Sequence, residues 1–326
     1  MNQPQQQLAE NYYYSEYPLA SQDCRAEILA GLGQCPKAIA PKYFYDMRGS
    51  QLFERITRTP EYYPTVTELG LYQRYAQEIA QACGTGAVVL EPGSGNSEKI
   101  RLLLNALAPS AYAGFDIAGE FLQRAAGQLA SEYPWLDVFA LRADFNQLQQ
   151  LPAYLEQANK LIFYPGSTIG NMQPAQAIDF IKTLRGWLAP GDGGLLIGID
   201  LHKDTATLER AYNDKQGVTA AFNKNILCHI NTLLGSNFDP DAFAHRAVYN
   251  VAQQRIEMYL DCVQQQCVAY PGGELVVERG ESLHTEYSYK YTVEGIERLA
   301  SEAGFRVQQQ WLDAARLFSI TLMQPV

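Results

Sequence analysis

The feature that most constrains the fold is a regular alternation of strand and helix patterns across the middle of the chain. Strands are predicted at 87–90, 111–115, 137–142, 160–164 and 194–199, and helices at 97–107, 119–132 and 174–188. Repeated β–α pairs at this spacing favour an open, mostly parallel sheet with helices on both faces. The sequence therefore predicts an α/β fold with a doubly wound, Rossmann-like sheet.

The alternation breaks near residue 204, and this break defines the expected domain organisation. The chain then reads as helical and afterwards as β-rich up to about residue 289, and one more helix and two strands follow. We therefore expect a doubly wound domain over 65–204 plus 290–326, with an inserted α+β domain at 205–289. Residues 1–64 are expected to form an N-terminal arm packed on the insertion.

Composition narrows the class of partner. The net charge of −10 argues against a nucleic-acid groove and against an anionic membrane surface, since both require Lys and Arg. The N-terminus lacks the regions of a secretory signal, and no apolar run reaches about 18 residues. The six cysteines are scattered without zinc-binding spacing, so no metal is expected. These features are typical of a cytoplasmic protein with free thiols. Nothing in the sequence demands an oligomer, so a monomer is expected.

The stretch VVLEPGSGNSEK (88–99) is a strand that runs into a Gly-x-Gly turn before a predicted helix. A dinucleotide fingerprint requires a third glycine, where this chain has Glu98. A carboxylate at a helix start also repels a pyrophosphate. S-adenosylmethionine has no phosphate and carries an ammonium and a sulfonium, so acidic neighbours suit it. The turn therefore favours S-adenosylmethionine over a nicotinamide cofactor.

Three acids stand at the ends of three successive predicted strands, where ligands bind in a doubly wound sheet. Glu91 ends the first strand, Asp116 the second, and Asp144 with Phe145 follows the third. Asp116 can accept both ribose hydroxyls, Asp144 the adenine amine, and Phe145 can stack on the adenine. Asp116 and Asp144 could instead merely cap the helices that follow them. Taken together, the three favour an adenosyl cofactor.

The fourth strand continues into LIFYPGSTIGN (161–171), a Gly-Ser-Thr loop that faces the same edge of the sheet. Gly166 would allow substrate and cofactor to approach closely, and Asn171 offers both a donor and an acceptor. This arrangement suits an acceptor amino acid, although a turn followed by a helix cap is an equally good interpretation of the pattern alone.

Several longer motifs then point to a family. They are PKYFYDMRGSQLFERITRTPEYYPTVTE (41–68), EPGSGNSEK (91–99), GSTIGN (166–171), DLHKD (200–204), AYND (211–214), GVTAAFNKNIL (217–227), IEMYL (256–260) and TEYSYKY (285–291). With these motifs the chain resembles, from about residue 22 onward, the histidine-specific Nα-methyltransferases of ergothioneine biosynthesis. The resemblance implies a class I methyltransferase sheet with an inserted substrate-binding domain. It also implies trimethylation of L-histidine to hercynine through mono- and dimethyl intermediates, with S-adenosylmethionine as methyl donor and no metal.

The resemblance also implies a set of site residues. Tyr45 would face the substrate amine, Gly166 would abut it, and Met258 would flank the imidazole ring. Tyr62, Asn171 and Tyr212 would hold the carboxylate, and Glu286 and Ser288 would bind the imidazole nitrogens. The cofactor residues would be Glu91, Gly93, Ser94, Gly95, Lys99, Asp116, Asp144 and Phe145.

The chemistry of methyl transfer agrees with these assignments. Displacement at a sulfonium needs no metal, so the rate comes from positioning and from the electrostatics of a desolvated site. The attacking amine must lose a proton, and Tyr45 is the candidate catalytic relay. A carboxylate and a hydroxyl two residues apart on a strand, Glu286 and Ser288, share one face. The four histidines are expected to be structural or surface residues.

Two alternatives remain open at this stage. One is an Nα-methyltransferase for another aromatic amino acid, tryptophan or tyrosine, although an indole or phenol needs no carboxylate partner such as Glu286. The other is a non-catalytic S-adenosylmethionine-binding protein, which would keep the turn at 91–99 and lose the acceptor residues.

Overall fold

The computed structural model describes residues 6–17, 24–145, 148, 150–156 and 159–326. Its residues form two compact units. The first contains the described residues of 1–20, 67–201 and 291–326, and the second those of 21–66 and 202–290. The two units are described separately below.

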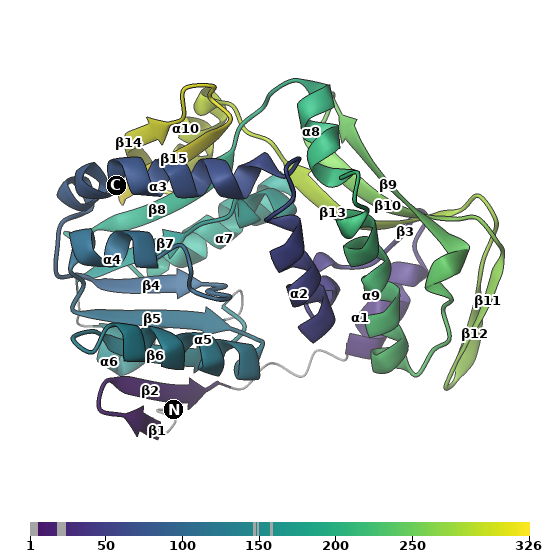
Figure 1. Ribbon diagram of the computed structural model, residues 1–326, viewed down its shortest axis with the longest axis horizontal. Helices are drawn as coiled ribbons and strands as arrows, with labels where there is room; N and C mark the ends of the chain where they lie inside the picture. Colours follow the sequence, from purple (N-terminus) through teal and green to yellow (C-terminus); the bar gives the residue numbers. More distant parts are fainter. Residues whose placement is uncertain (1–5, 18–23, 146–147, 149, 157–158) are drawn as a thin grey trace. The chain divides into compact units, whose positions relative to one another are not determined.

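The first unit is built on a mixed sheet whose strand order is β1-β2-β6-β5-β4-β7-β8-β15-β14 (Figure 1). The strands are β1 (Gln6–Ala9), β2 (Tyr12–Glu16), β4 (Val88–Pro92), β5 (Ala111–Asp116), β6 (Asp137–Arg142), β7 (Lys160–Tyr164), β8 (Gly194–Asp200), β14 (Phe305–Leu312) and β15 (Phe318–Pro325). The run from β2 to β8 is parallel, and β1, β15 and β14 pair antiparallel. The order reverses beside β4, as in a doubly wound sheet.

Helices cover both faces of this sheet. They are α3 (Tyr63–Cys83, in this unit from residue 67), α4 (Arg101–Leu107), α5 (Gly119–Glu132), α6 (Ala153–Glu156), α7 (Pro174–Gly186) and α10 (Val293–Glu302), with the short η2 (Thr168–Asn171) after β7. Alternate residues of each strand enter two different cores, as the period of a strand requires. Val89 packs in the core formed with α3, α4 and α5, whereas Leu90 packs in the core formed with α6, α7 and α10. The predicted α/β doubly wound sheet is confirmed.

The second unit contains a four-stranded sheet in the order β3-β13-β10-β9. The strands are β3 (Lys37–Ala38), β9 (Phe243–Asn250), β10 (Arg255–Cys262) and β13 (Ser282–Tyr289), and β11 (Gln266–Tyr270) and β12 (Gly273–Val277) form a separate hairpin. The helices are α1 (Cys24–Leu32), η1 (Pro41–Phe44), α2 (Met47–Ile56), α8 (Thr205–Tyr212), α9 (Val218–Leu234) and η3 (Pro240–Ala242). Helix α9 packs on β9 and β10 and against α2 and η1.

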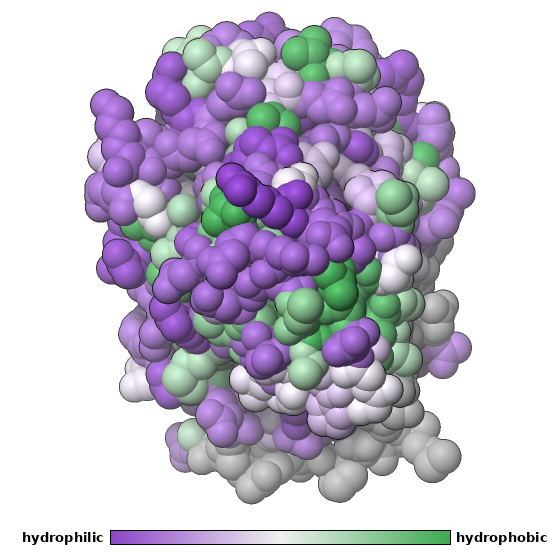
Figure 2. All heavy atoms as spheres, turned by 90° about the vertical axis from the view of Figure 1, so that its right-hand side faces the viewer, coloured by the Kyte–Doolittle hydropathy of each residue, from purple (hydrophilic) through white to green (hydrophobic). Residues whose placement is uncertain are grey.

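The surface of the molecule is mostly polar on the face shown in Figure 2, where hydrophobic side chains are interspersed among hydrophilic ones. Among the described residues, no helix is both long and apolar enough to cross a lipid bilayer.

Two expectations about local structure were wrong. Residues 12–16 of the expected arm form β2, which pairs with β6 and so lies in the large sheet, while residues 24–64 do belong to the second unit. The helix expected at 97–107 begins only at Arg101, because Ser97 has a φ of 52°, which an α-helix does not allow. Ser97 is fixed there by its hydroxyl, 2.9 Å from the Tyr112 Oη.

Candidate active site

The loop after β4 uses its backbone N–H groups inside the protein. Gly93 and Ser94 both donate to the Phe115 carbonyl, at 2.8 and 3.1 Å, and Gly95 donates to Asp116 Oδ2 at 3.3 Å. A phosphate cradle needs such groups pointing at the ligand, together with a helix that starts at the loop. In this loop the backbone N–H groups of Gly93, Ser94 and Gly95 already donate within the protein, and the next helix begins only at Arg101. The loop therefore fits a ligand that carries no phosphate, such as S-adenosylmethionine.

Asp116 lies at the end of β5 and fits the hydroxyl groups of a ribose. Its two carboxylate oxygens each accept one backbone N–H, from Gly95 and from Ala118, the latter at 2.9 Å. Each oxygen keeps a further lone pair for a ligand hydroxyl. Burial raises the pKa of Asp116, and the backbone N–H groups oppose that rise. The N-cap of α5 is Ala118, without a side-chain cap, so Asp116 is not the capping residue considered from sequence.

Phe145 lies beside the glycine loop, as an adenine-stacking residue requires. A Cβ added to Gly93 would lie 3.5 Å from the Phe145 ring. The Phe145 ring also makes an edge-on contact with Phe180, with centroids 5.9 Å apart. Asp144 precedes Phe145 and is half-buried. The ends of β4, β5 and β6 thus bring Gly93, Ser94, Gly95, Asp116 and Phe145 together.

Glu91 is a buried carboxyl at the end of β4. Its Oε2 accepts the Tyr112 hydroxyl at 2.6 Å, and its side chain is 2% exposed. Burial raises the pKa of Glu91 to about 8, against the hydrogen bond from Tyr112 and the charge of Lys99. A cation bound nearby would favour the ionised carboxylate. Glu91 is therefore suited to a positively charged ligand.

Glu68 on α3 is a site residue that sequence reasoning missed. Its Oε2 accepts from Lys99 Nζ at 2.7 Å and its Oε1 from the Gly166 N–H at 2.8 Å. The Tyr72 hydroxyl donates to the same Oε1 at 3.2 Å. Glu68 was the last residue of a quoted motif, but nothing in the motif indicated a contact with a residue 98 positions later. It joins a predicted cofactor residue to a predicted substrate residue.

The loop after β7 is held in one conformation. Gly166 has a φ of +86°, which glycine adopts without strain, and a Cβ there would lie 3.1 Å from Lys99 Nζ. Ser167 accepts the Asp200 N–H through its Oγ at 2.9 Å. Asn171 ends η2 and is half-buried. The first unit therefore holds Gly166 and Asn171 along with the predicted cofactor residues.

The second unit gathers the three tyrosines of the predicted substrate site through ring contacts. Tyr62 lies edge-on to Tyr212, with centroids 6.0 Å apart, and to Phe53 at 6.3 Å. Tyr45 lies edge-on to Phe53 and to Phe222, at 5.9 Å in each case. Tyr45 is 38% exposed, so part of this residue lies at the surface of the unit. Phe53 and Phe222 were not predicted, although aromatic faces suit a methylated ammonium.

Glu286, Ser288 and Met258 lie on adjacent strands of the second sheet. Met258 on β10 stands opposite Glu286 on β13. Burial raises the pKa of Glu286 to about 7, and the charge of Lys290 opposes that rise. All three side chains are buried. Glu286 and Ser288 therefore stand two positions apart on β13, and both lie in the interior of this unit.

A β-bulge at Thr285 precedes Glu286. The register passes from Met258 opposite Glu286 to Tyr259 opposite His284, which leaves Thr285 as the extra residue. Both Thr285 and Glu286 are buried, so the bulge breaks the strict alternation of faces. Bulges re-aim side chains in this way, and here the bulge decides which face of the sheet receives Glu286.

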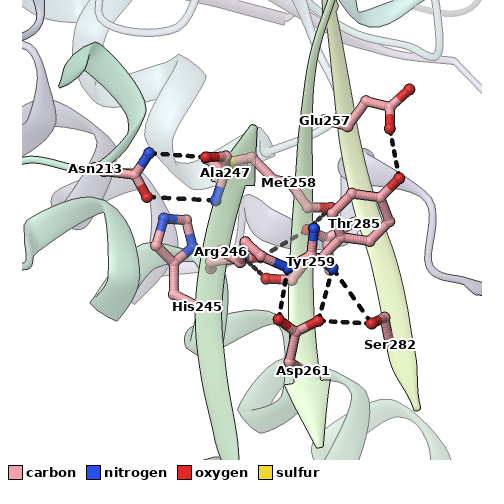
Figure 3. A network of polar contacts seen from close by, with 11 residues as sticks. Asn213, His245, Arg246, Ala247, Glu257, Met258, Tyr259, Asp261, Ser282 and Thr285 are labelled. Atoms are coloured by element: carbon pink, nitrogen blue, oxygen red, sulfur yellow. Dashed lines mark hydrogen bonds and ion pairs between the residues drawn. The ribbon is translucent and has the colours of Figure 1, made fainter. Parts of the chain in front are cut away.

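A buried polar network fixes this bulge. The Thr285 hydroxyl donates to Asn223 Oδ1 at 2.7 Å, and Asn223 Nδ2 lies 2.8 Å from His245 Nδ1. His245 Nε2 lies 2.8 Å from the Tyr212 carbonyl oxygen. Figure 3 shows this part of the sheet, with His245 and Thr285 on the strands that flank Met258 and Tyr259. The network connects the backbone of Tyr212 with the strand that carries Glu286.

Lys290 is a second residue that sequence reasoning missed. Its Nζ donates to Ser288 Oγ at 2.8 Å and to Tyr212 Oη at 3.1 Å, and these two hydroxyl oxygens lie 2.8 Å apart. Lys290 belongs to the quoted motif TEYSYKY, in which polar residues stand at every second position: Glu286, Ser288 and Lys290. This alternation could have indicated that Lys290 lies on the same face of the strand as the other two.

No group of three His, Cys, Asp or Glu side chains in the described part of the chain is arranged to hold a metal ion.

Comparison with known proteins places most of this chain in one family of methyltransferases. Residues 24–325 match the model of a family described as histidine-specific methyltransferase, SAM-dependent. The histidine N-alpha-methyltransferase of Mycolicibacterium smegmatis is 41% identical over 310 residues, which cover 93% of this chain and 95% of that one. Ergothioneine biosynthesis protein 1 of Neurospora crassa is 32% identical over 85% of this chain and 32% of its own length.

One solved structure, the CcbJ methyltransferase of Streptomyces caelestis, aligns with 78% of this chain and 96% of its own, with a TM-score of 0.47 and 13% identity.

Proposed function

Since this chain belongs to the family of SAM-dependent, histidine-specific methyltransferases, we propose that it methylates the α-nitrogen of L-histidine. Three successive transfers from S-adenosylmethionine would yield hercynine, the trimethyl betaine, as the first step of ergothioneine biosynthesis. The observation that carries the choice of histidine is the buried pair Glu286 and Ser288. A carboxylate can accept from one imidazole nitrogen while a hydroxyl donates to the other.

The residues of the first unit would bind the methyl donor. In this proposal Asp116 accepts the ribose hydroxyls, Asp144 binds the adenine amine, and Phe145 stacks on the adenine. Glu91, Lys99 and the loop at Gly93, Ser94 and Gly95 would hold the amino-acid end. S-adenosylmethionine supplies the methyl group on a sulfonium, which is already a good leaving group. The task left to the protein is to orient the donor and exclude water.

The remaining residues would bind and orient the acceptor. Tyr62, Asn171 and Tyr212 would hold the substrate carboxylate, Met258 would flank the ring, and Gly166 would leave room beside the amine. Tyr45 would relay the proton that the α-ammonium must lose before it can attack, accepting it at the hydroxyl oxygen while passing its own hydroxyl proton on to water. The rings of the Tyr45 and Tyr62 cluster would stabilise the growing methylammonium by about 0.5–2 kcal/mol.

The test is a methyl-transfer assay with S-adenosylmethionine and each of the twenty amino acids, read by product mass. We expect gains of up to three methyl groups on histidine and none on the others. Methylation of tryptophan or tyrosine instead of histidine would refute the role given to Glu286 and Ser288. Binding of S-adenosylmethionine without any transfer would support a non-catalytic protein.

Two further parts of the proposal concern the protein in the cell. We propose a cytoplasmic monomer, in line with the sequence analysis, that acts on free histidine. Light scattering coupled to gel filtration tests the monomeric state, and a mass of two chains would refute it.

A further inference from the structure

His245 on β9 lies between the two ends of the predicted acceptor site. It is half-buried, and its Nε2 lies 2.8 Å from the carbonyl oxygen of Tyr212. Its Nδ1 lies 2.8 Å from Nδ2 of Asn223, whose Oδ1 accepts the Thr285 hydroxyl at 2.7 Å. These contacts form a row of hydrogen bonds from Tyr212 to Thr285, which directly precedes Glu286. The proposed function assigns His245 no part.

The groups around Asn223 fix the orientation of its side-chain amide. The Tyr259 carbonyl oxygen lies 2.9 Å from Nδ2 and can only accept, so the amide nitrogen must stand at that position. This nitrogen carries two hydrogens, of which one goes to Tyr259 and the other to His245 Nδ1. The amide oxygen then faces the Thr285 hydroxyl, which donates to it. His245 Nδ1 therefore accepts a hydrogen bond and carries no hydrogen.

The Tyr212 carbonyl determines the state of the other ring nitrogen. A carbonyl oxygen only accepts, so Nε2 of His245 carries the hydrogen. The ring is neutral, since a second hydrogen on Nδ1 would face a hydrogen of the Asn223 amide. Burial lowers the pKa of His245, which favours the neutral ring, against the Tyr212 carbonyl and the charges of Asp214 and Asp261. Every hydrogen bond in this row therefore has one direction.

The Tyr212 end of the row is held to β9 at two neighbouring points. Asn213, the next residue in the chain, donates from Nδ2 to the Ala247 carbonyl at 2.9 Å and accepts the Ala247 N–H at 3.3 Å. His245 and Ala247 are two residues apart on β9 and share one face of the strand. Figure 3 shows Asn213 and His245 on the same side of this strand. The backbone that carries the Tyr212 side chain is thus fixed by β9.

The Thr285 end of the row sets the direction of Glu286. Thr285 is the extra residue of the bulge, and its hydroxyl has a second acceptor, the Met258 carbonyl, at 3.2 Å. A hydroxyl has one hydrogen, so the Asn223 oxygen at 2.7 Å is what draws Thr285 towards α9. Asn223 and Thr285 are both 0% exposed, so a bond that either loses is not replaced by bulk water. Glu286 follows directly and depends on the bulge for its direction.

We propose that His245 is a positioning residue for the acceptor, with its hydrogen on Nε2. Through that hydrogen it fixes the Tyr212 backbone, and through Nδ1 and Asn223 it fixes the bulge that directs Glu286. One imidazole of the protein thus sets the group that holds the ligand carboxylate relative to the group that binds the ligand imidazole. The proposal rests on the proposed function, because it takes histidine as the ligand.

Two substitutions release the two ends of the row separately. In His245→Asn the amide oxygen takes the place of Nδ1 and keeps the bond from Asn223, while the bond to Tyr212 is lost. In His245→Gln the amide nitrogen takes the place of Nε2 and keeps the bond to Tyr212, while the bond from Asn223 is lost. Each variant therefore holds one end of the row and frees the other.

The assay measures the affinities of L-histidine and histamine by calorimetry on protein saturated with S-adenosylhomocysteine. Histamine has the imidazole and lacks the carboxylate, so it reports the Glu286 end alone. We expect His245→Gln to weaken the binding of both ligands by about five- to tenfold. His245→Asn should weaken histidine by a similar factor and change histamine little. His202→Gln is the matched control, since His202 is exposed and lies outside the row, and it should change neither affinity.

Nitrogen-15 NMR of the histidine rings tests the count of hydrogens without any ligand. We expect the ring of His245, identified through its backbone resonances, to show a protonated Nε2 and an unprotonated Nδ1 at neutral pH. A hydrogen on Nδ1 would overturn the inference, and this measurement needs only the wild-type protein if a variant does not fold.

The outcomes separate this inference from the proposed function. Equal losses of affinity for histidine and histamine in both variants would show a merely structural role and overturn the inference. Unchanged affinities in both variants would overturn it as well. A wild-type protein with the expected ring hydrogens that neither binds nor methylates histidine would refute the proposed function instead, while the row of hydrogen bonds would stand.

Discussion

The substitution Gly198→Ala offers a sharp test of the role of Glu68. Gly198 lies on β8, and a Cβ added there would lie 2.1 Å from Glu68 Oε1 and 3.1 Å from the Phe318 ring. Ordinary contacts begin at 3.4 Å, so the carboxylate would have to move by about 1.3 Å. That shift breaks the bonds to the Gly166 N–H at 2.8 Å and to Lys99 Nζ at 2.7 Å.

The expected loss of stability follows from these contacts. Overpacking a core costs about 1–3 kcal/mol, and a buried donor left without its acceptor costs a similar amount. Because Lys99 is partly exposed and can turn to water, we expect a total of about 2–4 kcal/mol. At about 2–4 °C per kcal/mol, the Tm should fall by roughly 5–15 °C. The Gly166 loop should also lose its fixed conformation, and S-adenosylmethionine should bind more weakly.

The assay is thermal unfolding followed by calorimetric titration with S-adenosylmethionine. Gly70→Ala is the matched control, since Gly70 lies on the same helix as Glu68 and a Cβ there would meet no atom within 4 Å. Alanine in a helix interior should raise stability by about 0.5–1 kcal/mol. A Gly198→Ala protein with the wild-type Tm and wild-type affinity would refute the assignment of Glu68.

Three further predictions concern other residues of the site. Glu91 has a pKa of about 8 in the folded chain against 4.5 as its ordinary value, so its contribution to stability is lost as the pH rises from 4.5 through 8. Glu91→Gln should therefore gain on the wild type over this range by up to about 1.4 kcal/mol per pH unit in urea unfolding, and parallel curves would contradict this. Thr285→Val leaves Asn223 Oδ1 without its donor and should lower the unfolding free energy by about 1–3 kcal/mol while weakening histidine binding. An unchanged affinity for histidine would show that the bulge at Thr285 plays no part in binding it. Tyr45→Phe should reduce kcat by about 100-fold or more with a smaller change in histidine affinity, and an undiminished kcat would exclude Tyr45 as the proton relay.

The sheet of the first unit could be predicted because its pattern is local. Apolar runs of strand length and intervening helical periods place β5 through β8 within a residue or two of where they occur. Strand β2 was missed because it is a short, tyrosine-rich segment whose partner, β6, lies more than a hundred residues later. The start of α4 was missed because a left-handed serine is decided by a tertiary hydrogen bond to Tyr112.

The residues of the candidate site also fall into those that a local pattern predicts and those that only tertiary contacts determine. Residues next to strand ends, such as Asp116, follow from the alternation itself, since strand ends in a parallel sheet share one edge. Glu68 lies inside a helix and acquires its role only when the chain brings the β7 loop to it. The period of β13 predicts that Glu286 and Ser288 share a face, but the bulge at Thr285 determines which face that is. Bulges of this kind leave no clear mark in a single sequence.

The measurement that tests the central claim most directly is tandem mass spectrometry of the product formed from L-histidine and S-adenosylmethionine. It reports both the number of methyl groups and the nitrogen that carries them. The account predicts three methyl groups on the α-nitrogen, seen as loss of trimethylamine from the product ion. Methyl groups on an imidazole nitrogen, or an unmodified histidine, would contradict it.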